Sequence, residues 1–163
     1  MEASQEKGQH KEKKENYSRF LLMLLASFVA MYVTMYFNTY STDHIYFSLT
    51  RFYMTCMGIS VMALIMLSFM RSMYSNKKKN LVIIIGSVSL FLAALTLVRT
   101  QTPVGDISYM QAMVPHHSIA ILTSARANIK DPEVRKLADE IIKAQEREIA
   151  EMKAHIKRLR SAR

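Results

Sequence analysis

The sequence predicts an all-α protein with three transmembrane helices followed by an extracytoplasmic antiparallel α-hairpin. Two observations favour this fold class: three long runs without a charged residue, and a charged tail whose apolar residues recur at helical spacing. We expect three segments. They are a disordered cytoplasmic arm over residues 1–17, a three-helix transmembrane anchor over 18–99 and the extracytoplasmic hairpin over 105–163.

The charge-free runs cover residues 20–37, 52–70 and 81–98, and each is 18 or 19 residues long. As helices they would span roughly 27–28 Å, close to the apolar thickness of a bilayer, about 30 Å. The first run is too long, and too far from the N-terminus, to be a signal peptide. The arm before it is polar and highly charged, which is typical of disorder.

Basic residues on the short flanks predict the orientation of the three helices. The first loop carries only Arg51, whereas the arm and the second loop are rich in lysine and arginine. The basic residues of these two segments are Lys7, Lys11, Lys13, Lys14, Arg19, Arg71, Lys77, Lys78 and Lys79. The positive-inside rule therefore places the N-terminus in the cytoplasm and the tail outside it.

The tail after residue 99 is predicted to form two helices. Pro103 and Gly105 break the chain, and Asp106 can cap a first helix that extends to about Asn128. The run 131–133 is Asp-Pro-Glu, which supplies an N-cap, a proline at the first helical position and an acid in the first turn. Because so few residues separate the helices, we expect them to pair antiparallel.

Helical phase gathers methionine and histidine on the facing stripes. The first stripe is Asp106, Met110, Met113, His117 and Ile121, and the second is Leu137, Ile141, Gln145, Glu148, Met152, His155 and Leu159. Pairing about the turn is predicted to set His117 near Gln145, Met113 near Glu148, Met110 near Met152 and Asp106 near His155. Pro115 lies opposite the first stripe, where it either bends the helix or simply faces solvent.

These stripes carry candidate metal ligands. The main candidates are Met110, Met113, His116, His117 and Met152, and further candidates are Glu148, His155 and Asp106. Thioethers and imidazoles without cysteine suit Cu(I) or Ag(I) in an oxidising compartment, where thiolates would be lost as disulfides. His44, in the first loop, is not expected to contribute.

Each candidate also has a plainer interpretation. Methionines at this spacing often fill a core, and adjacent histidines point about 100° apart, so His117 is favoured as a ligand and His116 as a supporting group or a ligand to a second ion. Glu148 either pairs with a histidine or acts as a hard ligand, which would admit zinc or Cu(II). His155 is either solvated or a ligand.

Composition and motifs argue against two other functions. The net charge of +9 is spread over membrane flanks and mixed helix faces, so we do not expect nucleic-acid binding. The chain has no glycine-rich phosphate loop, no nucleophile–base–acid set and no paired Glu-x-x-His motifs, so we do not expect an enzyme.

Two motifs in the tail resemble a known family. Residues 109–117 read YMQAMVPHH, and the second helix carries Ala138, Ile141, Gln145, Glu148 and Met152 at the family's spacing. The resemblance is to the bacterial domain-of-unknown-function 305 family (DUF305), over about residues 106–157. It implies a ferritin-like half-bundle and, from CopM-like members, extracytoplasmic copper and silver binding through Met110, Met113, His116, His117 and Met152. Thr123 stands where that family has a further methionine.

We therefore expect a membrane-anchored protein of the bacterial cytoplasmic membrane, with a periplasmic domain that binds copper, and possible binding of silver or zinc. The alternative is an accessory subunit of a membrane complex, with the hairpin as a docking module. A two-helix unit buries little core, so we expect a homo-oligomer, such as a four-helix bundle, or a larger membrane complex.

Overall fold

The computed structural model describes the backbone of residues 2–162 and the side chains of residues 17–162. The described residues form five α-helices, one 3-10 turn and no strand, which confirms the all-α prediction. The helices are α1 (Glu2–Thr34), η1 (Thr42–His44), α2 (Leu49–Phe69), α3 (Lys77–Thr100), α4 (Asp106–Arg126) and α5 (Pro132–Ser161). The predicted disordered arm lies outside the described side chains, apart from Tyr17, and stays a prediction.

The chain divides into two compact units. The first contains Met1–Tyr32 and Tyr53–Thr100, and the second contains Val33–Phe52 and Gln101–Arg163. The second unit therefore joins the loop between α1 and α2 to the two C-terminal helices.

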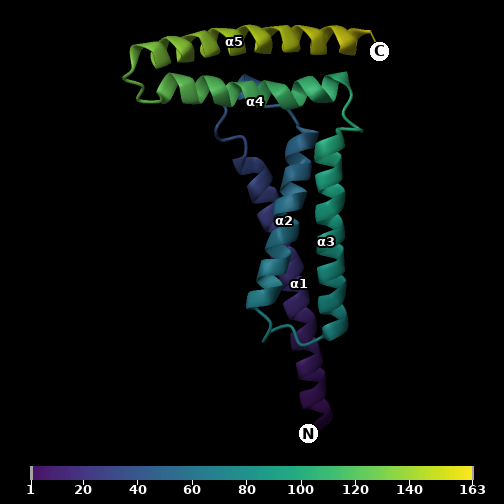
Figure 1. The fold of residues 1–163 in the computed structure, drawn as a ribbon. Coiled ribbons are helices and arrows are strands. Elements are labelled where there is room, and N and C mark those ends of the chain that lie inside the picture. Colours follow the sequence, from purple (N-terminus) through teal and green to yellow (C-terminus); the bar gives the residue numbers. More distant parts are fainter. Residues whose placement is uncertain (1, 163) are drawn as a thin grey trace. The chain divides into compact units, whose positions relative to one another are not determined.

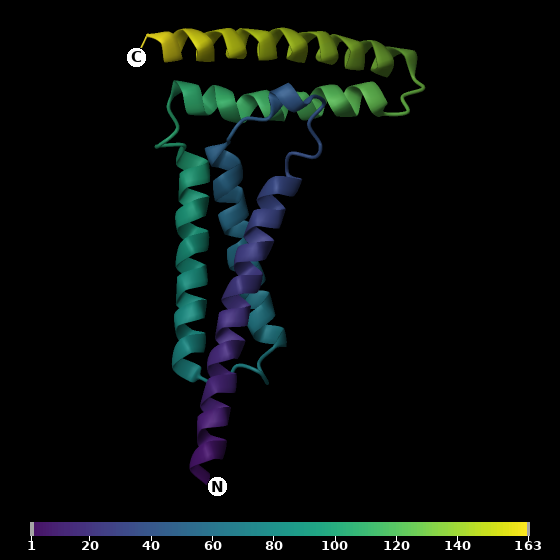
Figure 2. The ribbon, with the colours of Figure 1, turned by 180° about the vertical axis from the view of Figure 1, so that it is seen from behind.

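The first unit is a bundle of apolar helices, which lie side by side in both views (Figures 1 and 2). Its buried core is formed by Phe20, Ala63, Leu67 and Tyr74, contributed by α1, α2 and the loop before α3. All three helices are long and apolar enough to cross a membrane. The helices α2 and α3 begin three and four residues before the predicted charge-free runs, because helix formation continues through flanking polar residues.

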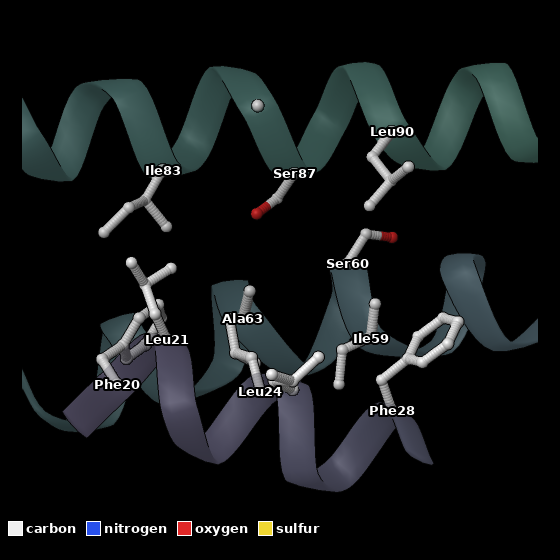
Figure 3. Close-up of a pocket in the computed structure, with 12 residues that line it drawn as sticks. Phe20, Leu21, Leu24, Phe28, Ile59, Ser60, Ala63, Ile83, Ser87 and Leu90 are labelled. Atoms are coloured by element: carbon white, nitrogen blue, oxygen red, sulfur yellow. The ribbon is translucent and has the colours of Figure 1, made fainter. Parts of the chain in front are cut away.

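The surface of this unit is apolar as well. Leu22, Leu25 and Val82 are more than 60% exposed, and Phe69 is 87% exposed. Such a surface suits an apolar surrounding rather than water. Between the helices lies an apolar cavity of about 380 Å³, into which two small polar side chains, Ser60 and Ser87, project from α2 and α3 (Figure 3).

The second unit contains α4 and α5, which run side by side and are joined by residues 127–131 (Figures 1 and 2). The predicted cap of α5 is confirmed: the Asp131 carboxylate accepts hydrogen bonds from the backbone N–H groups of Glu133 (2.9 Å) and Val134 (3.0 Å). The predicted cap of α4 is wrong. Gly105 occupies the N-cap position, and Asp106 is the first helical residue, where its charge favours the positive end of the helix.

Candidate functional site

The core between α4 and α5 is a small aliphatic cluster. Val114 and Ile121 of α4 and Ile149 of α5 are buried together, and Ile142 and Met152 pack against them. This core places Met152 at the boundary of the cluster, half-buried, so its thioether lies next to the side chains of α4.

His117 is the best-defined polar group in the contact between these helices. Its Nε2 lies 2.8 Å from Glu148 Oε2, and its Nδ1 lies 3.0 Å from the carbonyl oxygen of Met113. The His117 side chain is 13% exposed and that of Glu148 is 41% exposed. The ring is therefore held at both nitrogens, while the carboxylate keeps access to solvent.

The two hydrogen bonds restrict the protonation of this ring. A carbonyl oxygen and an ionised carboxylate are both acceptors, so an imidazolium satisfies both contacts by donating from each nitrogen. When the neutral ring keeps its proton on Nδ1 and donates to Met113, the lone pair of Nε2 points toward Glu148. Fixing one nitrogen by a backbone carbonyl is how proteins commonly orient a histidine that binds metal through the other.

The remaining main candidates differ in exposure. Met110 is buried (8% exposed), Met113 is half-buried, and His116 is exposed. The centres of the His116 and His117 rings lie 6.0 Å apart, and the ring planes are inclined by 63°. The assignment of His117 as a ligand, and of His116 as a supporting group or a ligand to a second ion, stays a prediction.

The further candidates lie away from this group, with one exception. Glu148 contacts His117, whereas His155 is exposed on α5. Asp106 is exposed and lines a cavity with Leu159 and Arg160 at the other end of the helix pair. Among the described residues, no group of three or more histidine, cysteine, aspartate or glutamate side chains could hold a metal ion.

The predicted pairing of the helices is wrong by about one turn. Glu148, not Gln145, meets His117, and Asp106 lies near Leu159 and Arg160 rather than near His155. Side chains on a helix lean toward its N-terminus, which is away from the turn on α4 and toward the turn on α5. A residue of α4 therefore meets a residue farther along α5 than simple pairing about the turn gives.

The buried stripe of α5 is also rotated from the predicted one. Ala138, Ile149 and Ile156 are buried, whereas Leu137, placed in the predicted stripe, is 56% exposed. The observed stripe follows the spacing of a heptad, which turns it away from His155. With Ile142 and Met152, which pack against the same core, the stripe has spacings of 4, 7, 3 and 4 residues, and this pattern could have been found in the sequence.

A contact that the sequence did not reveal joins the loop between α1 and α2 to α4. The backbone N–H of Tyr40 donates to Ser118 Oγ (2.8 Å), and His44 Nδ1 lies 3.0 Å from the same oxygen. Ser118 and Pro115, one turn earlier, are both fully buried, so the interpretation that Pro115 faces solvent is wrong. Figure 2 shows this loop lying across α4.

The same loop is tied to α5 by charge. The Lys153 ammonium donates to the Asp43 carboxylate. That hydrogen bond, with one from Ser41, lowers the pKa of Asp43 to about 2. Burial lowers the pKa of His44, and the nearby charge of Lys153 adds to this effect. His44 therefore belongs to the same unit as the candidate site, and a substitution of His44 is not a neutral control for metal binding.

Thr123 occupies the position where the related family has a methionine. Its hydroxyl donates to the carbonyl oxygens of Ile119 (3.0 Å) and Ala120 (3.2 Å) on its own helix. The side chain is thus bonded back to α4 and does not replace the missing thioether.

Taken with the apolar bundle, this geometry defines an all-α protein whose C-terminal helix pair displays histidine, methionine and glutamate. Residues 96–162 match the family described as "Domain of unknown function (DUF305)", and the chain belongs to this family.

A similar protein is known from Acanthamoeba polyphaga mimivirus, described as "Uncharacterized protein L153". It is 37% identical over 140 residues, which cover 84% of this chain and 90% of that protein. No solved structure matches the chain. The viral relative gives no support to the predicted bacterial origin, which stays a prediction.

Proposed function

We propose that this chain is a membrane-anchored metal-binding protein whose α4–α5 pair, an antiparallel hairpin, binds Cu(I) or Ag(I) on the extracytoplasmic side. The observation that carries the proposal is the placement of His117. One ring nitrogen is fixed by the Met113 carbonyl oxygen at 3.0 Å, and the other lies against Glu148 at 2.8 Å, between two helices that also carry methionine.

The donor set fits a soft, monovalent ion. Neutral imidazole and thioether are ligands that Cu(I) accepts, and no cysteine stands on α4 or α5 to be oxidised. His117 would bind through Nε2, with Met110, Met113 and Met152 as the sulfur donors. Bound there, the ion would be held for copper handling or tolerance. Silver, with similar preferences, would bind to the same donors.

Glu148 determines how well the site discriminates against divalent ions. Its carboxylate lies within hydrogen-bonding distance of the proposed ligand nitrogen, and carboxylates favour harder ions such as Zn(II). We expect Glu148 to pair with His117 in the metal-free protein and to contribute little to Cu(I).

The membrane part of the proposal is supported by the three apolar helices and the basic flanks. It is tested by fusing reporters after Arg163. Periplasmic alkaline phosphatase should be active and cytoplasmic fluorescence absent when the chain is expressed in a bacterium. The reverse pattern would put the helix pair in the cytoplasm and contradict the extracytoplasmic site.

The metal part is tested with the full chain in detergent, by competition against a chromophoric Cu(I) chelator. Cu(I) should bind more tightly than Zn(II), and His117→Ala or Met152→Ala should each weaken Cu(I) at least about tenfold. Met73→Ala is the matched control, because Met73 is 47% exposed in the loop between α2 and α3. Tighter binding of Zn(II) than of Cu(I) would contradict the soft-ion assignment.

The second candidate function is an accessory subunit of a membrane complex that uses the helix pair for docking. The observation in its favour is the exposed apolar surface near the start of α5, where Val134 is 49% and Leu137 56% exposed. Co-purification with a larger complex at fixed stoichiometry, lost on Leu137→Glu but retained in His117→Ala, would support this function over metal binding.

A further inference from the structure

The start of α3 combines lysines and an apolar groove in an unusual way. Lys77, Lys78 and Lys79 stand in the first turn of the helix, where the positive end of the helix dipole disfavours cations. All three are exposed. The sequence has no aspartate or glutamate between Asp43 and Asp106, so the described part of this unit offers these lysines no counter-ion.

Two of these lysines border a groove with an apolar wall. The groove measures about 450 Å³ and is lined by Tyr17, Leu21, Lys78, Lys79, Val82 and Ile83. Lys77 does not line it. The groove therefore has a cationic rim formed by two ammonium groups above aliphatic side chains, which is the complement of an amphipathic anion.

The wall of this groove is held in place by hydrogen bonds. The Tyr17 hydroxyl donates to Asn80 Oδ1 (2.7 Å), and Asn80 Nδ2 donates to the carbonyl oxygen of Tyr74 (2.8 Å). The Lys79 ammonium lies 4.9 Å from the centre of the Tyr17 ring, a cation–π contact that holds the charge over the groove. Tyr17 and Lys79 are therefore held in position, and Lys78 adds a second, exposed charge beside them.

The groove shares two lining residues with the apolar cavity between the helices. Leu21 and Ile83 line both spaces, and the cavity continues past Leu24 and Leu90 (Figure 3). A ligand with a charged head at the lysines can thus extend an apolar chain along the helices. A free phosphate or a soluble acidic metabolite would leave this apolar path unused.

We propose that this groove binds one anionic phospholipid, with its headgroup phosphate at Lys78 and Lys79 and an acyl chain against Leu21 and Ile83. This inference rests on the proposed membrane anchor. The lysines stand at the start of α3, directly after the second loop, which that proposal places on the cytoplasmic side, where anionic lipids concentrate.

The chain contains no tryptophan, so a single tryptophan can report on the groove. Leu22→Trp is introduced into the full chain, which is reconstituted in phosphatidylcholine vesicles. Leu22 is exposed on α1 beside Leu21 and does not line the groove, so Tyr17 keeps its contacts. Brominated phosphatidylglycerol is then compared with brominated phosphatidylcholine as a quencher. We expect the anionic lipid to bind near the Trp reporter several-fold more tightly than phosphatidylcholine. Lys78→Gln and Lys79→Gln should each reduce this preference by up to about fivefold, and clearly more than the control variant does.

The matched control is Lys77→Gln, which removes the same charge from the same turn but not from the groove. It should leave the preference largely intact. A second reporter, Phe69→Trp, lies on exposed α2 surface outside the groove and should show little preference. Equal quenching by the two lipids at Trp in position 22, or an equal loss in the Lys77 variant, would overturn the lipid site.

Two further outcomes are distinct. If neither brominated lipid quenches either reporter, the chain is not in the bilayer, and the membrane anchor itself is wrong together with the lipid site. Deletion of residues 2–16 should leave the preference unchanged. If the preference appears only after this deletion, the acidic residues of the chain's own arm occupy the groove, and the lipid assignment is wrong.

Discussion

Replacing either partner of the contact between His117 and Glu148 breaks the same hydrogen bond but should have different effects on metal binding. The contact is short, 2.8 Å, yet the Glu148 side chain is 41% exposed. Solvent therefore screens the pair, and we estimate its contribution to folding at about 1 kcal/mol. Because Glu148 can be hydrated when left alone, His117→Ala should not add a large penalty for a stranded charge.

The two variants are therefore expected to differ more in Cu(I) binding than in stability. Glu148→Ala should lower the free energy of unfolding by about 1 kcal/mol, and His117→Ala by somewhat more, because it also removes the bond to the Met113 carbonyl oxygen. Only His117→Ala removes the proposed ligand nitrogen, so only it should weaken Cu(I) by at least about tenfold, or ~1.4 kcal/mol. Glu148→Ala should leave Cu(I) within a few-fold of the native chain and weaken Zn(II) more.

The assay is chelator competition for Cu(I) and Zn(II), with denaturant unfolding of the same preparations. Equal loss of Cu(I) affinity in both variants would mean that the contact acts only by holding the helices together. Unchanged Cu(I) affinity in His117→Ala would refute the ligand assignment outright, whatever the stability of the variant.

Three other predictions concern residues around this contact. His116→Ala should weaken Cu(I) less than His117→Ala in the same competition assay, because the His116 ring is exposed. Asp131→Ala removes the cap of α5 and should lower the free energy of unfolding in denaturant by about 1 kcal/mol. Asp43, with its pKa lowered to about 2 by Lys153, stabilises the folded state above its unfolded pKa of about 3.9. The stability difference between the native chain and Asp43→Asn should therefore disappear as the pH falls from about 4 to 2.

The sequence predicted those parts of the fold that depend on local chemistry. Runs without charge form the apolar helices, and the Asp131-Pro132 start of α5 is observed because an N-cap depends only on residues within one turn. Met110 and Met113 lie on α4 as expected. These features need no knowledge of what packs against them.

The parts that could not be predicted depend on contacts between distant segments. Ser118 is fully buried because Tyr40 and His44, more than 70 residues earlier, bond to it. Helical phase alone shows which residues share a face, but it does not show which face a loop will cover. Pairing of Glu148 with a histidine was one of the predicted alternatives and is observed. The predicted register nevertheless put Gln145 opposite His117, because side-chain direction shifts the pairing of the helices.

The comparison with the viral protein bears on how the two units belong together. Its aligned stretch of 140 residues is longer than the family match over residues 96–162, so the similarity must extend into the apolar helices. The viral relative is thus similar in sequence over parts of both the apolar helices and the helix pair. With a single held histidine, and with Thr123 bonded to its own helix, the pair offers few soft donors. Such a donor set suits the binding of one ion close to a membrane better than storage of many, and this distinguishes handling from bulk sequestration in the function we propose.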